Sequence, residues 1–419
     1  MATLLRNGTL VDGTGTDPIA NAAVLIGDDG SVEYAGAESG LDAKASAGAD
    51  VVDVGGNTIM PGFFDCHTHL AFVTGTDDII FPTVNQEAMY TYAQMIRNLK
   101  VTLEAGVTSV RDLCGMDRGF VESIDDGLLV GPRMTASCGG ITAPGGHFDF
   151  TMPCGFDPVG AITAPNCEVF YINGPYEARN ATRRLIAKGA KVIKITTTGG
   201  VMSPNDSSTD TGLTLDEVQA IVDIASTHMG GIPVTSHAQG PAGIEVALKA
   251  GLKCIEHGTM LTDDQVTFMA ANDVGLVPTL IVALTPPSGD VLPQVLKKLE
   301  IAKASAVESY QKALKAGVKI GLGTDVGLAP KHGTNLQELR FMLDNGATPM
   351  QAFLAGTKNA AEIVGTIDAV GTLEVGKRGD VVVGRGDATS DFEGVLRGLG
   401  DTDTNILRVY KDGDLVVSR

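Results

Sequence analysis

Short apolar runs separated by Gly, Asp and Asn clusters characterise both ends of the chain, and this pattern predicts short strands joined by turns. The predicted strands are Leu4–Val11, Ala23–Gly27, Val32–Ala35 and Val51–Asp53 at one end, and Gly371–Val375, Asp380–Gly384, Ile406–Tyr410 and Leu415–Ser418 at the other. Either end alone is too small to bury a good core. We therefore expect one β-sandwich domain formed from both termini, residues 1–57 and 366–419.

Between the two ends the pattern changes to strands that alternate with helices, which is typical of a parallel sheet or barrel. The predicted strands are Gly62–His67, Thr108–Leu113, Arg133–Cys138, Val192–Thr197, Pro233–His237, Cys254–His257, Gly275–Pro278 and Lys319–Thr324. The clearest helices are Gln86–Ala105, Pro175–Lys188, Leu215–Met229, Pro241–Ala250, Asp263–Asn272, Leu296–Ala316 and Asn335–Asn345. Eight strands, each followed by helix, predict an α/β chain with a (β/α)8 TIM barrel over residues 58–365.

Charge and cysteine usage narrow the functional classes. The net charge of −19 disfavours nucleic acids and anionic membrane surfaces as partners. The first residues lack a secretory signal, and the longest apolar run is about half of a bilayer span. Six scattered cysteines fit reduced thiols in a cytoplasmic protein; Cys154 and Cys167 would pair only if the chain were exported. Whether the chain forms a homo-oligomer is left open.

Metal-ligand residue types gather at the predicted strand ends. His67 and His69 are two residues apart, so both side chains face the same side of a strand. His237 and His257 end later strands, and Asp325 follows the last one. Active residues of α/β barrels lie at this end of the strands. Because the chain has only seven histidines and four occupy these positions, the pattern indicates a metal site.

Lys194 stands in the middle of a β-branched strand, where an unpaired lysine is rarely buried. Lys191 has the opposite parity and is expected to be solvated. An ion pair with Asp325 is one explanation for Lys194.

These residues resemble the amidohydrolase superfamily, and within it the imidazolonepropionase-like branch that contains metal-dependent Xaa-Pro and Xaa-Arg dipeptidases (prolidase-like). The segments that carry the resemblance are Pro61–His69, Lys194, His237, Glu256–Gly258, Gly323–Asp325, Gly371–Asp380 and Lys411–Gly413.

The resemblance implies a binuclear site that usually holds two zinc ions. His67, His69 and Asp325 would hold one ion, and His237 and His257 the other. Lys194 would carry a CO2-derived carboxylate and bridge the two ions, which supplies the anionic ligand that an ammonium cannot. A metal-bound hydroxide would attack the substrate, and Asp325 would act as a catalytic base as well as a ligand.

The connection from Gly139 to Gly174 is long enough to suggest a functional loop. Within it, we expect His147 to be a catalytic and substrate-binding residue, with packing of the loop as the alternative. Tyr171 and Gln239 are also candidate substrate contacts.

Two further residues are candidate substrate contacts. Arg111 ends a strand where it could pair an anionic substrate group, although an ion pair with Asp112 or Asp65 is the favoured alternative. His332 follows Asp325 in a loop that could border the pocket.

The predicted function is a metal-dependent dipeptidase or carboxypeptidase that cleaves the amide of dipeptides or N-acyl amino acids, with Xaa-Pro dipeptides favoured. Opening of a cyclic amide of the imidazolone or lactam type is the enzymatic alternative. A non-catalytic interaction protein on a hydrolase barrel is disfavoured, because all six ligand positions are filled.

Overall fold

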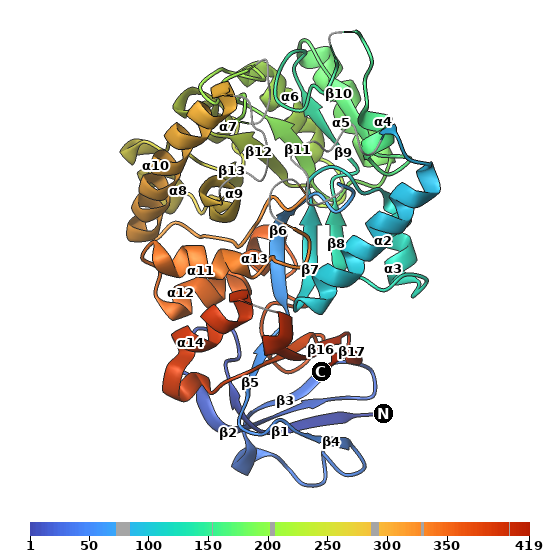
Figure 1. Ribbon diagram of the computed structural model, residues 1–419, viewed down its shortest axis with the longest axis vertical. Helices are drawn as coiled ribbons and strands as arrows, with labels where there is room; N and C mark the ends of the chain where they lie inside the picture. Colours follow the sequence, from blue (N-terminus) through green and yellow to red (C-terminus); the bar gives the residue numbers. More distant parts are fainter. Residues whose placement is uncertain (73–83, 153, 202–205, 286–292, 328–330, 402) are drawn as a thin grey trace. The chain divides into compact units, whose positions relative to one another are not determined.

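The computed structural model describes residues 1–419 except 73–83, 153, 202–205, 286–292, 328–330 and 402 (Figure 1). The described residues form two compact units. The first consists of Met1–Asp65, Lys100–Ser109 and Gly333–Arg419, and the second of Cys66–Leu99 and Val110–His332. No helix of this described part is both long and apolar enough to span a bilayer.

The first unit contains an eight-stranded sheet built from both ends of the chain. Its strands are β1 (Thr3–Leu10), β2 (Ile19–Ile26), β3 (Val32–Ala37), β4 (Asp50–Asp53), β5 (Thr58–Pro61), β15 (Val381–Gly384), β16 (Ile406–Lys411) and β17 (Asp414–Ser418). β5 joins the two halves, since it pairs in parallel with β1 and antiparallel with β15. Inward-facing residues such as Leu5, Ile26, Ile59 and Val383 share one core. The sheet therefore depends on residues more than 300 positions apart in the sequence.

The C-terminal segment is less strand-rich than the sequence predicts. Gly371–Val375 is not a strand, because the N–H of the buried Leu373 donates to the Asp12 carbonyl and Gly371 has a left-handed φ of 96°. A helix that the prediction omitted, α14 (Ala388–Asp401), follows β15 and contacts α11 (Gln337–Asp344) and α12 (Pro349–Ala355). Its buried residues Val395, Leu396 and Leu399 have helical spacing.

The second unit carries a parallel sheet flanked by helices. Its strand order is β10 (Glu168–Tyr171), β9 (Gly139–Thr142), β11 (Ile193–Thr196), β12 (Val234–Ala238), β13 (Cys254–His257) and β14 (Gly275–Val277). The helices that follow these strands contact one another in sequence; they are α5 (Pro175–Ala187), α6 (Leu215–Ser226), α7 (Pro241–Lys249), α8 (Asp263–Ala271) and α10 (Pro293–Ala316). Capping boxes fix the starts of α6 and α8. The parallel pairing brings the carboxyl ends of the strands to one edge.

A three-stranded sheet has the order β6 (Phe63–Thr68), β7 (Val107–Asp112) and β8 (Arg133–Ala136). Helix α2 (Ala88–Glu104) follows β6, and α3 (Arg118–Asp125) follows β7. The short helix α4 (Val159–Ile162) lies in the connection between β9 and β10. The predicted strand Arg133–Cys138 stops at Ala136, and β9 begins at Gly139. Positive φ angles at Cys138 and Gly139 interrupt the extended backbone where the chain passes from β8 to β9.

The predicted strand Lys319–Thr324 is also not continuous. Isolated parallel bridges join Ile320 to Leu276 and Val326 to Thr68. Backbone bonds still run from this segment to its neighbours, because Cys66 N–H donates to the Leu322 carbonyl and Asp325 N–H donates to the His67 carbonyl. The α/β class is therefore confirmed. The described strands belong to separate sheets, so a closed eight-stranded barrel stays a prediction.

Candidate metal centre

The end of β6 and the segment 319–326 bring three potential metal ligands together. The imidazole Nε2 atoms of His67 and His69 lie 3.5 Å and 3.1 Å from Asp325 Oδ1. One ligand atom from each of the three residues lies within 4.8 Å of the others. Because Asp325 N–H donates to the His67 carbonyl, the backbone itself holds the carboxylate beside the two rings.

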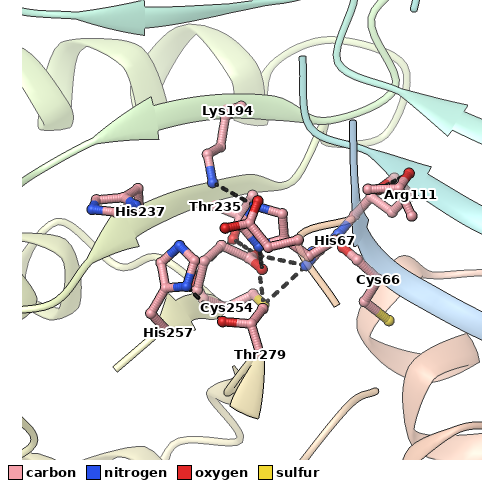
Figure 2. A network of polar contacts seen from close by, with 12 residues as sticks. Cys66, His67, Arg111, Lys194, Thr235, His237, Cys254, His257 and Thr279 are labelled. Atoms are coloured by element: carbon pink, nitrogen blue, oxygen red, sulfur yellow. Dashed lines mark hydrogen bonds and ion pairs between the residues drawn. The ribbon is translucent and has the colours of Figure 1, made fainter. Parts of the chain in front are cut away.

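The remaining predicted ligands adjoin this group (Figure 2). The ring centroids of His67 and His257 are 5.0 Å apart, and those of His257 and His237 are 4.6 Å apart. Lys194 Nζ lies 3.5 Å from His67 Nε2. The parallel register explains the gathering, since Thr196 pairs with His237 and Ala238 pairs with His257 across β11, β12 and β13. The four imidazoles and Lys194 are all buried.

Each of the four imidazoles has a hydrogen-bond partner at one ring nitrogen. The pairs are His67 Nδ1 with Glu256 Oε2 (2.9 Å), His69 Nδ1 with the Cys114 carbonyl (2.7 Å), His237 Nε2 with the Gly199 carbonyl (3.1 Å), and His257 Nδ1 with Thr279 Oγ1 (2.7 Å). In a neutral imidazole one nitrogen carries the proton and the other has a free lone pair. If the paired nitrogen donates in each case, the lone pair of the other nitrogen is available to a metal, as in most metal-bound histidines.

Glu256 is the centre of a buried polar network that includes His67, Arg111 and Thr235. Its second carboxylate oxygen accepts hydrogen bonds from Arg111 Nη2 at 2.5 Å and from the Thr235 hydroxyl. Arg111 also donates from Nε to the Cys66 carbonyl at 2.7 Å, which connects the network to the residue before His67. Burial opposes ionisation of Glu256, but Arg111 and His67 hold the pKa of its carboxyl well below the usual range. The carboxylate is therefore anionic and fully bonded.

Burial keeps most of these imidazoles neutral. It lowers the pKa of His67 to about 4 and that of His257 to about 3, with the Lys194 charge contributing to both shifts. Burial also lowers the pKa of Lys194 to about 8, although Glu256 and Asp325 oppose this shift. Burial would raise the pKa of Asp325, but the neighbouring histidines hold it well below the usual range. Burial lowers the pKa of His237 as well. It also opposes the charged form of His69, but the hydrogen bond to Asp325 raises the pKa of that ring above its usual value. Three uncharged rings, His69 and the Asp325 carboxylate form a donor set that suits a divalent cation.

His147 lies over this cluster from the long loop after β9. Its ring stacks on His237 with a centroid distance of 3.9 Å. A Cβ built on Gly200 would lie 2.2 Å from His147 Nδ1, so the absence of a side chain at position 200 makes room for the ring. Burial, together with the nearby His257 and Lys194, lowers the pKa of His147 to about 3. The structure thus places this predicted residue at the cluster as a neutral imidazole.

Arg111 has a different partner from the two that the sequence suggested. It pairs with Glu256, not with Asp112 or Asp65, and is only 2% exposed. Asp112 instead accepts from the backbone N–H groups of Leu70 and Met116. Arg111 therefore lies among the buried groups behind His67.

The other three candidate substrate contacts differ in their surroundings. The Tyr171 hydroxyl donates to Asp157 Oδ2 at 3.1 Å. Gln239 is buried two residues after His237, and its Oε1 has no hydrogen-bond partner among the described residues. His332 donates from Nε2 to the Phe72 carbonyl at 3.0 Å, and the Phe72 ring stacks on His69. His332 is thus connected to the predicted ligand His69 through one intervening residue, Phe72.

The cysteine arrangement corrects the pairing considered above. All six cysteines are free. Cys154 is exposed, whereas Cys167 is buried with its Sγ 3.8 Å from that of Cys114. The two cysteines that lie close together are therefore Cys114 and Cys167, which the sequence separates by 53 positions.

Two residues of the centre were given no contact or chemical role in the sequence analysis, although Glu256 stands in a segment that carries the resemblance. Glu256 precedes a predicted ligand in a strand, and an acidic residue in such a buried strand was the signal available for it. Thr279 follows β14, and a threonine in that position carries no distinguishing signal.

Comparison with known proteins identifies the class to which this fold and centre belong. The model of the amidohydrolase family matches residues 58–416. The chain belongs to this family and is a hydrolase that acts on C–N bonds, so the resemblance noted in its motifs is confirmed. The family is metal-dependent, and the His67, His69 and Asp325 group is a candidate metal site.

Three relatives are similar over nearly the whole chain. An ochratoxinase from Aspergillus niger is 32% identical over 400 residues, which cover 91% of this chain and 80% of that protein. The structure of a prolidase in complex with N-methylphosphonate-L-proline is 29% identical, covers 100% of both chains and superposes with a TM-score of 0.88. The structure of a Xaa-Pro dipeptidase with methionine in its active site is 29% identical, covers 99% of both chains and has a TM-score of 0.85.

Proposed function

We propose that this amidohydrolase is a binuclear metal-dependent dipeptidase that favours Xaa-Pro dipeptides. The observation that carries the proposal is the convergence of His67, His69 and Asp325 on one another, with ligand atoms within 4.8 Å. His237, His257 and Lys194 adjoin the same group. Such a set exceeds what one cation needs, since a catalytic zinc site commonly uses three protein ligands.

We further propose that the strands of residues 58–365 form a closed (β/α)8 barrel, with a β-sandwich of residues 1–57 and 366–419. Backbone hydrogen bonds support the closure on two sides. The segment 319–326 bonds to β14 through Leu276 and to β6 through Cys66 and His67. On the other side, Lys191 N–H donates to the Ala136 carbonyl at the end of β8, and Ile195 pairs with Ile141 of β9. These contacts would place the centre at the C-terminal ends of the strands, where barrel enzymes have their active sites.

In this proposal His67, His69 and Asp325 hold one ion, and His237 and His257 hold the other. The donor set fits two divalent cations such as zinc, because the four rings offer free lone pairs and are already oriented by their partners. Lys194 would be carboxylated by CO2 at Nζ and contact both ions. A pKa lowered to about 8 favours the neutral amine that reacts with CO2, and the product is an anion among cations.

The ions, when bound, would supply Lewis acidity that activates water and polarises the scissile carbonyl. Asp325 would accept a proton from the attacking water and pass it to the leaving nitrogen, because its carboxylate stays ionised and lies beside His67 and His69. His147 would donate a hydrogen bond to the substrate, since it covers His237 from the loop side. Gln239, Tyr171 and His332 remain candidate substrate contacts, and Arg111 would act through Glu256.

The substrate class is inferred from the relatives. Two of the solved structures are described as a prolidase and a Xaa-Pro dipeptidase, and both superpose on essentially the whole chain. A proline at the second position makes the scissile bond a tertiary amide, so the leaving group is a secondary amine that needs a proton. Asp325 can supply that proton in the proposed mechanism.

A substrate panel tests the proposal. Zinc-loaded protein would be assayed by steady-state release of amino acid from Xaa-Pro dipeptides, matched Xaa-Ala dipeptides, N-acyl amino acids and five- or six-membered cyclic amides. We expect kcat/KM to be highest for the Xaa-Pro series. Preference for cyclic amides would replace the dipeptidase assignment with ring opening. No hydrolysis of any member by metal-loaded protein would contradict the proposed substrate class.

A further inference from the structure

Thr279 contacts the cluster of predicted metal ligands. It follows Pro278, which is the first residue after β14. Its hydroxyl oxygen lies 2.7 Å from His257 Nδ1, and the residue is 1% exposed (Figure 2). The parallel register of β13 and β14 pairs Glu256 with Val277, so that His257 at the end of β13 lies near Thr279, two residues after the end of β14. The contact therefore arises from the ends of two neighbouring strands.

The backbone at Thr279 is in an unfavourable conformation. Its φ and ψ are both 49°, in the left-handed region that β-branched residues rarely adopt. His257 is left-handed as well, with φ at 67°. Strain of this kind persists where the surrounding structure fixes it, and it concentrates at functional sites. At this site the two left-handed residues turn toward each other at successive strand ends and are joined by their side chains.

The hydrogen bond between Thr279 and His257 determines which ring nitrogen of His257 has a free lone pair. A threonine hydroxyl can accept the proton of Nδ1–H, and this fixes the tautomer in which Nε2 is free. We infer that Thr279 is a positioning residue that holds His257 in the orientation and tautomer required of a metal ligand. The inference rests on the proposed role of His257 as a ligand.

The partner of His257 differs from those of the other three imidazoles. His67 is held by the carboxylate of Glu256, and His69 and His237 are held by backbone carbonyls. His257 is held by a neutral hydroxyl, which an isosteric substitution removes without leaving a buried charge. The ion held by His237 and His257 should therefore be lost selectively when the hydroxyl is removed.

The experiment compares Thr279→Val, which removes the hydroxyl and keeps the shape, with Thr279→Ser, which keeps the hydroxyl. Thr182→Val is the matched control, because Thr182 is also fully buried but its hydroxyl donates to the Ala178 carbonyl within α5. Zinc content and zinc affinity would be measured by competition with a chromogenic chelator. The coordination of the metal would be followed in the visible absorption spectrum of cobalt-loaded protein.

We expect Thr279→Val to bind one of its two ions about tenfold more weakly or worse, with a changed cobalt spectrum. Thr279→Ser and Thr182→Val should match the parent protein. Thr279→Ala makes the same test if the valine variant does not fold. The inference is overturned if the hydroxyl-free variants bind both ions as the parent does, or if Thr279→Ser loses as much affinity as they do.

The failure of this inference is distinguishable from the failure of the proposed function. A parent protein that holds two ions but cleaves no dipeptide would contradict the substrate proposal, while the affinity differences would still report on Thr279. A parent protein that holds no divalent ion would overturn both.

Discussion

Lys194 is the residue whose proposed role requires a chemical change. It is fully buried in β11, its Nζ lies 3.5 Å from His67 Nε2, and burial lowers its pKa to about 8. An ammonium in that position would repel any cation bound by the neighbouring histidines, and in a poorly solvated pocket such repulsion is strong. A carboxylated lysine would replace this repulsion with attraction.

Lys194→Ala should therefore lose most bound metal and most activity, whereas Lys191→Ala should retain both. Lys191 is the matched control, because it precedes the same strand but is exposed, and its Nζ contacts Met229 Sδ at 4.0 Å. Metal content by elemental analysis and turnover of an Xaa-Pro dipeptide would be measured for both variants. An added short-chain carboxylic acid should partly restore Lys194→Ala, because only a small bridging carboxylate is missing. Full metal and full rate in Lys194→Ala would refute the role of this residue.

For single residues, the sequence allowed the candidate metal ligands to be identified, but not the hydrogen-bond partners of the buried polar side chains. Histidines at strand ends could be recognised because strand parity and the parallel arrangement determine where they point. The partner of Arg111 could not, because Glu256 is 145 positions away and only the packed strands bring the two together. The same reason explains why the link between Thr279 and His257 was not foreseen.

The loop after β11 shows how one element shapes another. Gly200 follows that strand, and its Cα faces the His147 ring so closely that a Cβ would lie 2.2 Å from Nδ1 and 2.4 Å from Cε1. His147 in turn stacks on His237. The position of the long loop over the cluster therefore depends on a glycine in a different loop.

Gly200→Ala should displace the His147 ring and lower kcat/KM for the dipeptide about tenfold or more, because small displacements of positioned groups carry large rate costs. Gly160→Ala is the control, since Gly160 lies in α4 with open space around it and alanine favours a helix. Steady-state kinetics and near-ultraviolet circular dichroism would be recorded for both. Unchanged kinetics in a folded Gly200→Ala variant would argue against a role for His147 in binding substrate.

Regular elements were predictable where one pattern ran unbroken. The helices α5, α6, α7 and α8 begin within a residue of their expected positions, because proline or capping residues mark their starts. The break between β8 and β9 was not predictable, because a left-handed φ at Cys138 depends on tertiary contacts. The segment 319–326 likewise reads as a strand but makes only isolated bridges.

Within the described part of the molecule, burial lowers the pKa of several histidines, both in the cluster and outside it. His332 illustrates the consequence, because burial lowers its pKa to about 4 from an ordinary value of 6.5. The unfolded chain takes up a proton near pH 6.5, whereas the folded chain does so only near pH 4. Stability from this group is therefore complete above about pH 6.5 and is lost as the pH falls toward 4.

His332→Asn should make the free energy of unfolding of the metal-free protein less dependent on pH between 6.5 and 4. The slope of the unfolding free energy against pH should be smaller in the variant than in the parent, by up to about 1.4 kcal/mol per pH unit. This difference corresponds to the uptake of one proton on unfolding. Asparagine keeps a hydrogen-bond donor toward the Phe72 carbonyl. The surface carboxylates are the same in both proteins, so their contribution to the pH dependence cancels in the comparison. Urea unfolding of chelator-treated samples across this range would give both slopes; identical slopes would show that His332 is not held neutral by the fold.

The sequence predicted that the two ends of the chain form one structural unit, because each end alone is too short to bury a hydrophobic core. The role of β5 as the link was not, because residues 58–61 read as the start of the barrel and yet pair with β1 and β15. Pairings across more than 300 positions leave no local trace in the sequence.

The proposed hydrolysis requires two metal ions bound per chain. Chelator-treated protein would be titrated with zinc at neutral pH, in bicarbonate buffer, while turnover of an Xaa-Pro dipeptide and bound zinc are followed together. We expect negligible turnover without metal and a rise in turnover that saturates when two ions are bound per chain. Full turnover by protein shown to contain no metal would contradict this expectation.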